Sequence, residues 1–132
     1  MSDEHEVKNI AIAIVESDDR FLIGQRPEGS PLAGFWEFPG GKVELNETFD
    51  QAAERECLEE TGLNVSADFV LLENTAVYSH GTVRLHFVSC TLKEPLRKPN
   101  APFRWVHRQD LRHFRFPEGN REILEKIAQR RS

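Results

Sequence analysis

The stretch Gly41–Leu63, GKVELNETFDQAAERECLEETGL, contains seven acidic side chains. Three of them, Glu56, Glu59 and Glu60, lie within five residues and directly follow Arg55. Like charges at such short spacing repel each other, so this concentration of acids needs a physical explanation. The same stretch also carries the clearest helix signal in the chain, so the acidic residues are expected to lie on a helix.

The Gly41–Leu63 stretch predicts one amphipathic helix with defined ends. Thr48 is a suitable N-cap residue, and Gln51 three positions later completes a capping box. Gly62 fits the C-terminal end, because glycine readily adopts the left-handed conformation that ends many helices. Apolar residues recur at helical spacing between these ends and predict a core-facing stripe: Phe49, Ala53 and Cys57.

The acidic residues of this helix have two explanations. Glu56 stands beside both Glu59 and Glu60, because neighbours on one helix face are three and four positions apart. Each like-charge pair costs only about 0.2–0.5 kcal/mol, so a solvated acidic face is one explanation. The other is a cation site. Carboxylate and carbonyl oxygens are the donors that Mg²⁺ or Mn²⁺ prefers, and the Gly40-Gly41 turn lets backbone carbonyls approach a ligand closely.

Predicted strands dominate the rest of the chain. Apolar and β-branched runs indicate them at 7–17, 21–26, 35–38, 68–79, 83–93 and 103–108. Turn and loop residues separate them at 17–20, 27–34 and 92–102. A second helix over 118–130 is predicted from its apolar side, Ile123, Leu124, Ile127 and Ala128. This pattern predicts an α+β fold, a mixed β-sheet with helices packed on its faces.

Composition limits the class of protein. The 132 residues suit a single domain, 1–132, with a flexible tail at 1–6. No apolar run reaches the ~20 residues of a membrane helix, and the net charge of −5 argues against nucleic acid as a partner. The two cysteines, Cys57 and Cys90, are expected to be small buried hydrophobes rather than a disulfide framework. We therefore expect a cytoplasmic protein, monomeric or weakly dimeric.

The acidic stretch resembles the Nudix box, the 23-residue signature of the Nudix hydrolases. The matching residues have the spacing of that signature: Gly41, Glu47, Arg55, Glu56, Glu59, Glu60, Gly62 and Leu63. Cys57 departs mildly, since the family usually has a larger aliphatic residue there, and we expect this to affect packing rather than chemistry. The resemblance implies the Nudix fold, a mixed sheet sandwiched by helices (α/β/α). It also implies hydrolysis of a nucleoside diphosphate linked to another group, with Mg²⁺ or Mn²⁺ as cofactor.

The resemblance also implies a role for each residue of the box. The implied metal ligands are the carbonyl of Gly40 and the side chains of Glu56, Glu59 and Glu60. Arg55 is the implied orienting cation, in agreement with the forked geometry in which a guanidinium holds a carboxylate. Glu47 is an auxiliary carboxylate, and Glu56 is the general base that takes a proton from the attacking water.

The similarity extends from about Val7 to the last helix and is to the MutT-like branch of the family. It is carried by LIGQRP (22–27), WEFPGGKVE (36–44) and FPEGN (116–120). Members of this branch hydrolyse oxidised purine nucleoside triphosphates, notably 8-oxo-dGTP, to the monophosphate and pyrophosphate. This reaction removes damaged nucleotides from the pool used for DNA synthesis. The residues implied for substrate binding are Arg26, Glu37, Phe38, Pro39 and Asn120.

These assignments have alternatives. Phe38 suits a plain core position, Arg26 a solvated strand end, and Asn120 a helix cap. The stretch AGFWEFPGGKVE (33–44) resembles enzymes that hydrolyse CTP or modified dCTP about as well. A non-catalytic nucleotide-recognition module would also keep the fold.

One loop departs from the MutT-like pattern. Such proteins often carry a further metal-binding acid before the strand that holds Trp105, whereas no Asp or Glu occurs between Glu94 and Asp110. Arg97 and Lys98 occupy this loop instead. They either attract a triphosphate or belong to a solvated surface, and the number of bound metal ions stays open.

Overall fold

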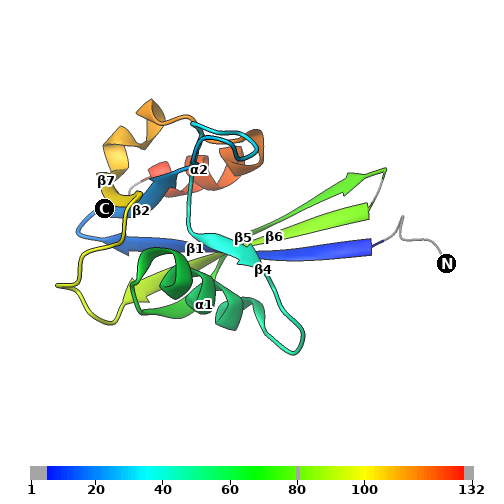
Figure 1. Cartoon of the computed structure of the whole chain (residues 1–132), viewed down its shortest axis with the longest axis horizontal. Helices are drawn as coiled ribbons and strands as arrows, with labels where there is room; N and C mark the ends of the chain where they lie inside the picture. Colours follow the sequence, from blue (N-terminus) through cyan, green and yellow to red (C-terminus); the bar gives the residue numbers. More distant parts are fainter. Residues whose placement is uncertain (1–5, 80, 130–132) are drawn as a thin grey trace.

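The computed structural model describes residues 6–79 and 81–129, and its strands form one mixed sheet (Figure 1). The order is β3-β2-β1-β6-β5, with β4 paired to β1 and β7 paired to β2. β1 runs parallel to β6 and antiparallel to β2 and β4, so it is the central strand. In chain order the strands are β1 (Glu6–Ser17), β2 (Arg20–Gln25), β3 (Trp36–Glu37), β4 (Gly40–Lys42), β5 (Val65–Tyr78), β6 (Gly81–Leu92) and β7 (Phe103–His107).

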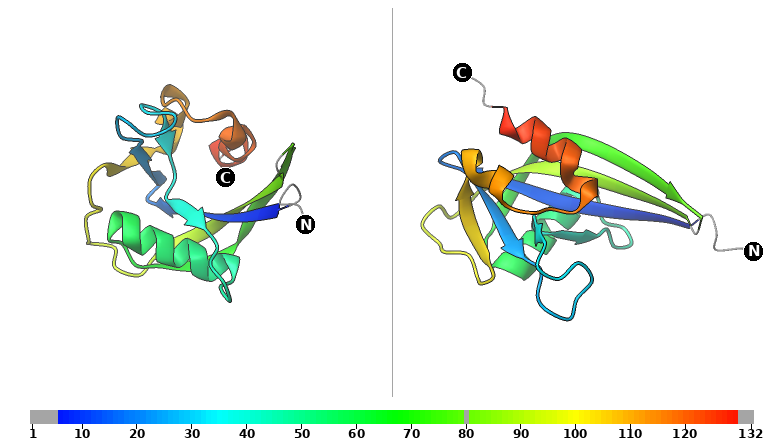
Figure 2. Two further views of the ribbon diagram at one scale, coloured as in Figure 1. Left: turned by 45° about the vertical axis from the view of Figure 1, so that its right-hand side comes forward. Right: turned by 90° about the horizontal axis from the view of Figure 1, so that it is seen from above.

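Two helices, α1 (Phe49–Thr61) and α2 (Arg121–Ala128), cover opposite faces of this sheet (Figure 2). Side chains of β1 alternate between the two faces, as the period of a strand requires. Those that pack with α1 are Ala11, Ala13 and Val15, and those that pack with α2 are Ile12 and Ile14. The expected α+β class and the α/β/α arrangement are therefore confirmed.

Helix α1 has the two ends that its sequence predicts. The hydroxyl of Thr48 accepts a hydrogen bond from the backbone N–H of Gln51 at 3.0 Å, and the Gln51 side chain accepts one from the N–H of Thr48 at 2.9 Å. At the other end Gly62 adopts a left-handed φ of 78°, and its N–H donates to the carbonyl of Leu58. These caps set the rotation of the helix, and with it the direction in which each acidic side chain points.

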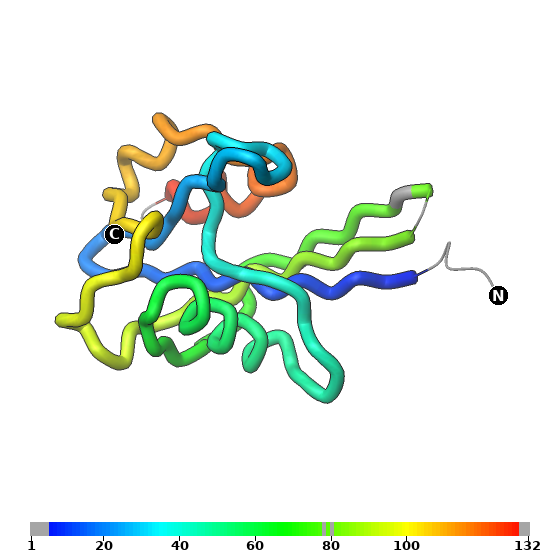
Figure 3. The backbone as a smooth tube through the Cα atoms, in the orientation of Figure 1, coloured from blue at the N-terminus to red at the C-terminus, as the bar shows by residue number. Residues whose placement is uncertain are grey.

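The strands β1, β5 and β6 extend beyond both helices on one side of the molecule (Figure 3). β5 and β6 form a long antiparallel hairpin, with register shifts between Ala67 and Phe69 and between Val70 and Leu72. Such bulges increase the local twist of a sheet. The extension leaves Leu72 and Leu85, on the α2 face of the sheet, only partly buried.

The Gly40-Gly41 pair differs from the expected turn. Residues 40–42 form strand β4, in which Gly40 pairs with Ile12 and Lys42 pairs with Ile10. Glycine is depleted in strands, so local sequence favours a turn at this position. The pairing with the distant strand β1 overrides that local preference.

The last helix is shorter than expected. Residues 118–120 form the 3₁₀ turn η3 (Glu118–Asn120), and the α-helix begins at Arg121. Ile123 and Ile127 are buried and Leu124 is half-buried, as predicted, but Ala128 is exposed. Ala128 is the last helical residue and is turned about 100° from Ile127, so no part of the sheet covers it.

Other element ends differ by a few residues, as is usual for boundaries read from sequence. β5 begins at Val65, three residues earlier than expected. Of the tail expected at 1–6, only Glu6 lies within the described residues, and it begins β1. The end of the helix expected over 118–130 lies partly outside the described residues.

The two cysteines behave as expected from the sequence. Cys57 and Cys90 are both buried and both free. His86 is half-buried and stacks on Phe49, with ring centroids 3.5 Å apart. Within residues 6–79 and 81–129, no helix is long and apolar enough to cross a membrane.

Replacing the N-cap residue should destabilise the protein through α1 alone. Thr48→Ala removes the acceptor for the Gln51 N–H, and we expect the free energy of unfolding in urea to fall by about 1 kcal/mol. Thr48→Ser keeps the acceptor and should lose only a fraction of that amount. Equal losses for the two variants would show that the hydroxyl does not cap the helix.

Candidate active site

The site is built where strand β4 passes closely over α1. A Cβ atom at Gly41 would lie 2.4 Å from the carboxyl carbon of Glu56, and one at Gly40 would lie 2.6 Å from the carbonyl oxygen of Ala11. No larger side chain fits at either position without displacing its neighbours. Close approach of backbone requires glycine at position 40, whereas a side chain at position 41 would displace the Glu56 carboxylate.

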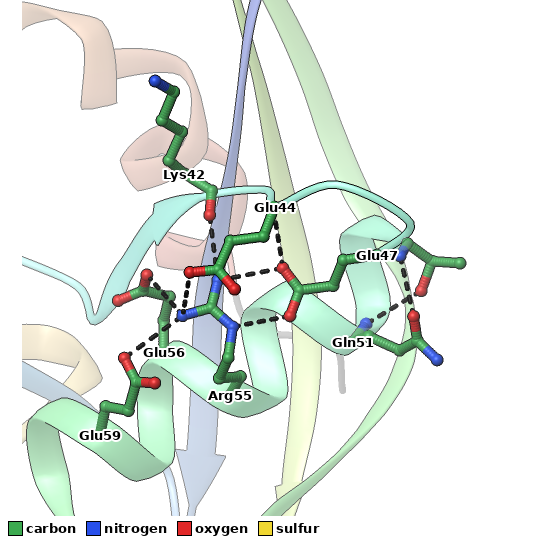
Figure 4. Close-up of polar contacts among 8 residues, drawn as sticks. Lys42, Glu44, Glu47, Gln51, Arg55, Glu56 and Glu59 are labelled. Carbon is green, nitrogen blue, oxygen red and sulfur yellow. Dashed lines mark hydrogen bonds and ion pairs between the residues drawn. The ribbon is translucent and has the colours of Figure 1, made fainter.

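The guanidinium of Arg55 organises the acids around it (Figure 4). It donates two parallel hydrogen bonds to Glu47, from Nε to Oε2 at 2.6 Å and from Nη2 to Oε1 at 3.0 Å. Nη2 also donates to the carbonyl of Lys42 at 3.0 Å, which ties β4 to the helix. On the other side Nη1 donates to Glu56 at 3.0 Å and to Glu59 at 3.2 Å.

These contacts alter the ionisation of Glu47 and Arg55, which together form a clamp that holds Glu56. The hydrogen bond from Arg55 and the N–H of Glu44 lower the pKa of Glu47 below its usual value. The hydrogen bond to Glu47 raises the pKa of Arg55 above its usual value, and Glu56 adds to this effect. The Glu47–Arg55 pair therefore stays charged, and it holds Glu56 in place through the second side of the guanidinium.

Glu60 lies on the other side of Glu56 and is largely removed from water. Burial raises the pKa of Glu60 to about 8, and its hydrogen bond with the Glu56 carboxylate adds to this effect. The N–H of Gly40 donates to Oε1 of Glu60 at 3.3 Å, and this hydrogen bond lowers the pKa of Glu60. The raised pKa favours the protonated form of Glu60 at neutral pH, because a second negative charge beside Glu56 is unfavourable.

The donor set at this point fits a hard divalent cation. The carboxyl groups of Glu56 and Glu60 lie beside the Gly40-Gly41 backbone, and carboxylate and carbonyl oxygens are the donors that Mg²⁺ or Mn²⁺ prefers. Glu59 is not part of this pair: its carboxylate faces Arg55, and its side chain is 59% exposed. Among the residues that the structure describes, no three His, Cys, Asp or Glu side chains are already arranged to hold a metal ion. Glu59 therefore stands apart from Glu56 and Glu60, paired with Arg55.

A second ion pair lies beside the acidic helix. Nη1 of Arg26 is 2.6 Å from Oε1 of Glu37, and Nε of Arg26 donates to the carbonyl of Pro31 at 2.7 Å. Arg26 is therefore held in place rather than solvated at a strand end. The charge of Glu37 contributes to the raised pKa of Glu60, so this pair and the acidic helix share one region of the surface.

Phe38 and Pro39 lie inside the protein. Phe38 is 5% exposed and stacks on Phe116, with ring centroids 5.0 Å apart. Pro39 is buried, and its carbonyl accepts a hydrogen bond from the N–H of Ala13 at 2.8 Å. As they stand, both residues support the wall of the site from behind, in agreement with the core alternative for Phe38.

Asn120 occupies the N-cap position of α2 but makes no capping hydrogen bond with its side chain. Its amide nitrogen makes one long contact, 3.5 Å to the carbonyl of Pro117. A Cβ atom at the adjacent Gly119 would lie 3.9 Å from Leu85, which places this turn next to the uncovered end of β6. The side-chain amide is therefore available for a ligand.

The contribution of residue 44 was not predicted from the sequence. The backbone N–H of Glu44 donates to Glu47 at 2.9 Å, and its carboxylate lies 3.7 Å from Arg55. No motif spacing marks Glu44, because its role follows from the path of the loop between β4 and α1.

Two large cavities lie away from the acidic helix. One, of about 670 Å³, lies between the sheet and α2 and includes Phe69 and Lys126 in its lining. The other, of about 590 Å³, lies between Phe114, Phe116 and the outer side of α2. Neither is lined by Glu56 or Glu60.

Comparisons with known proteins agree with this geometry. A family model for the NUDIX domain matches residues 10–126. The CTP pyrophosphohydrolase of Escherichia coli K12 is 36% identical over 111 residues, covering 70% of this chain and 82% of that protein. The 8-oxo-dGTP diphosphatase of Escherichia coli K12 is 31% identical over 121 residues, covering 89% of this chain and 94% of that protein.

Solved structures give the same result. The MutT protein of methicillin-resistant Staphylococcus aureus 252, described as a Nudix hydrolase, has a TM-score of 0.74 at 32% identity, covering 94% of this chain and 97% of that one. The ORF135 protein of E. coli has a TM-score of 0.73 at 28% identity, covering 92% of this chain and 88% of that one.

Replacing Arg55 by lysine should show whether the site needs the forked guanidinium or only its positive charge. Arg55→Lys keeps a positive charge but cannot hold Glu47 by two bonds and Glu56 by a third at once. Displacement of Glu56 should lower kcat/KM for 8-oxo-dGTP, the compound after which several relatives are named, by about 100-fold. The exposed Arg20 provides the control, since Arg20→Lys should leave kcat/KM unchanged. Full activity in Arg55→Lys would mean that the fork does not position Glu56.

Proposed function

The chain belongs to the Nudix family of hydrolases, and from this premise we propose that it is an Mg²⁺-dependent enzyme that hydrolyses 8-oxo-dGTP to the monophosphate and pyrophosphate. The observation that carries this proposal is the Glu56–Glu60 carboxyl pair, held beside Gly40-Gly41 by the clamp of Arg55 and Glu47. Nudix hydrolases use divalent cations and act on small nucleotides, and the sequence similarity supports a nucleoside triphosphate pyrophosphohydrolase.

The residues that would hold the cation are the carbonyl of Gly40 and the side chains of Glu56, Glu59 and Glu60. When bound, Mg²⁺ or Mn²⁺ neutralises negative charge on the phosphoryl oxygens, which otherwise repel a nucleophile. The chemical class of these ligands, all oxygens, favours Mg²⁺ or Mn²⁺ over softer metals.

The other chemistry belongs to side chains of this chain. Glu56 accepts a proton from the attacking water, whose oxygen forms a bond to phosphorus while a phosphoanhydride bond breaks. Arg55 keeps the Glu56 carboxylate in position, and Glu47 keeps Arg55 in position. The leaving group departs as pyrophosphate and the nucleoside monophosphate remains, so the net reaction consumes one water.

Recognition of the base is assigned to the other side of the site. Asn120 has an amide with one acceptor and two donors, and it lies in the turn next to the partly buried Leu85 of β6. Arg26, paired with Glu37, borders the same region as the acidic helix. Phe38 and Pro39 support this wall from within. A purine with an oxidised edge matches such a combination of apolar surface and directional amide.

A second substrate class is supported by a specific observation. The relative with 36% identity is named as a CTP pyrophosphohydrolase, and its identity is higher than that of the E. coli 8-oxo-dGTP diphosphatase. Hydrolysis of CTP or a modified dCTP is therefore the alternative. The same acids would act and pyrophosphate would again be released, but the pocket would accept a different base and the monophosphate product would differ.

A nucleotide panel tests the proposal. With Mg²⁺ present, kcat/KM should be highest for 8-oxo-dGTP compared with dGTP, CTP and 5-methyl-dCTP, with pyrophosphate rather than orthophosphate released. EDTA should abolish turnover and Mg²⁺ should restore it. Glu56→Gln should reduce kcat by about 100-fold or more, since it removes the proton acceptor. Equal kcat/KM for 8-oxo-dGTP and dGTP would eliminate the oxidised base, and a preference for CTP would favour the alternative.

Removing the amide of Asn120 should affect binding more than chemistry. Asn120→Ala should raise KM for 8-oxo-dGTP about tenfold, the effect of losing directional hydrogen bonds to the base, with kcat changed less than threefold. The stability of α2 should not change, because the side chain makes no capping bond. Asn64→Ala, at an exposed position, is the matched control and should leave KM unchanged. Identical KM values in all three proteins would exclude Asn120 from base recognition.

A further inference from the structure

Positive charge is concentrated in one segment of this acidic chain. Residues 93–116 carry seven lysines and arginines against two acids, Glu94 and Asp110, so the segment has a net charge of +5. The whole chain has a net charge of −5, so the remainder has a net charge of −10. The negative net charge of the chain therefore does not describe the local charge of this part of the surface.

Most of these cations are exposed and have no acidic partner. Arg108 is the exception, because it is paired with Glu16 and Asp19. The other six side chains are exposed, and within the described part of the chain none of them forms an ion pair. They are Lys93, Arg97, Lys98, Arg104, Arg112 and Arg115.

Two of the six cations lie over aromatic rings. The guanidinium carbon of Arg104 is 5.8 Å from the centre of the Trp36 ring and 5.5 Å from that of Phe114. That of Arg115 lies 4.3 Å from the centre of the Phe35 ring. A guanidinium held in this way keeps its N–H groups and loses less side-chain entropy when it binds an anion.

The two stacks adjoin each other and the candidate active site. The N–H of Trp36 donates to the carbonyl of Arg115 at 2.7 Å, so β3 lies against the segment that carries both cations. Glu37, the next residue of β3, is the partner of Arg26. Figure 1 shows the basic segment, coloured yellow to orange, along the side of the molecule opposite the free end of the β5–β6 hairpin.

We propose that this surface, defined by Arg104, Arg115 and the rings of Phe35, Trp36 and Phe114, binds single-stranded nucleic acid. Proteins that bind single strands without sequence preference combine backbone-tracking cations with flat groups on which bases stack. Here the unpaired cations would contact the phosphate backbone, and the guanidinium–aromatic stacks would provide flat groups for the bases. An acidic protein partner would pair with the cations alone and would have no bases to stack on the flat groups. The proposal goes beyond the hydrolysis of free nucleotides and does not depend on it.

Fluorescence anisotropy with a labelled twelve-nucleotide poly-dT strand tests the proposal on the full chain. We expect a Kd on the order of 10–100 µM at 50 mM salt, weakening as salt rises, as for non-specific binding through a few phosphates. Arg104→Ala/Arg115→Ala should weaken binding at least about tenfold. Lys8→Ala/Arg84→Ala removes two exposed positive charges elsewhere and is the matched control, with less than a twofold effect expected.

A charge-conserving variant separates stacking from simple attraction. Arg104→Lys/Arg115→Lys should keep the salt dependence but bind the strand several-fold more weakly, because an ammonium group does not stack. Poly-glutamate of equal charge should compete poorly. Circular dichroism and thermal melting of each variant confirm folding. Equal loss in the two alanine double variants, or competition by poly-glutamate at the same concentration as poly-dT, would overturn the proposal and indicate a surface for acidic partners only.

Discussion

The candidate site depends on one opposing charge, the guanidinium of Arg55, placed among carboxylates that would otherwise repel each other. Its two sides have different roles: one side is held by Glu47 and the carbonyl of Lys42, and the other holds Glu56. The position of the Glu56 carboxylate therefore depends, through this clamp, on the path of the loop between β4 and α1. Glu60 lies outside this clamp, and its pKa is raised by burial and by the adjacent Glu56. This leaves an energetic reason for a cation to bind there.

The sheet makes this arrangement possible by bringing backbone to the helix. β4 pairs with β1, and β1 lies between the two helices, so the Gly40-Gly41 backbone is fixed relative to the face of α1 that carries the acids. The absence of a side chain at Gly40 lets β4 approach β1, and its absence at Gly41 gives the Glu56 carboxylate room. Loss of Gly41 would therefore affect the chemistry of the site first, since its close contacts are with Glu56, whereas a side chain at Gly40 would press on the backbone of β1 at Ala11 and Ile12.

The parts of the fold that were predictable are those with local causes. The ends of α1 follow from Thr48, Gln51 and Gly62, whose hydrogen bonds lie within a few residues. Strand β4 was missed because its two glycines form a strand only through pairing with residues about thirty positions earlier. Ala128 was wrongly placed in the core because helical spacing alone does not show where the sheet ends. Long-range packing, which a local pattern does not contain, decided both cases.

The same distinction divides the site. Its chemical half is contiguous in sequence, from Gly40 to Glu60, so a spacing motif can contain it. The recognition half that we propose combines residues next to β2, β3, β6 and the turn before α2, and each contributes one or two side chains without a common pattern. Phe38 illustrates the difficulty: the same motif position is a buried core residue stacked on Phe116, and only the structure reveals this. The reaction class is thus encoded locally, whereas the choice of base is set by how distant segments pack, which explains why relatives of similar identity are named for different nucleotides.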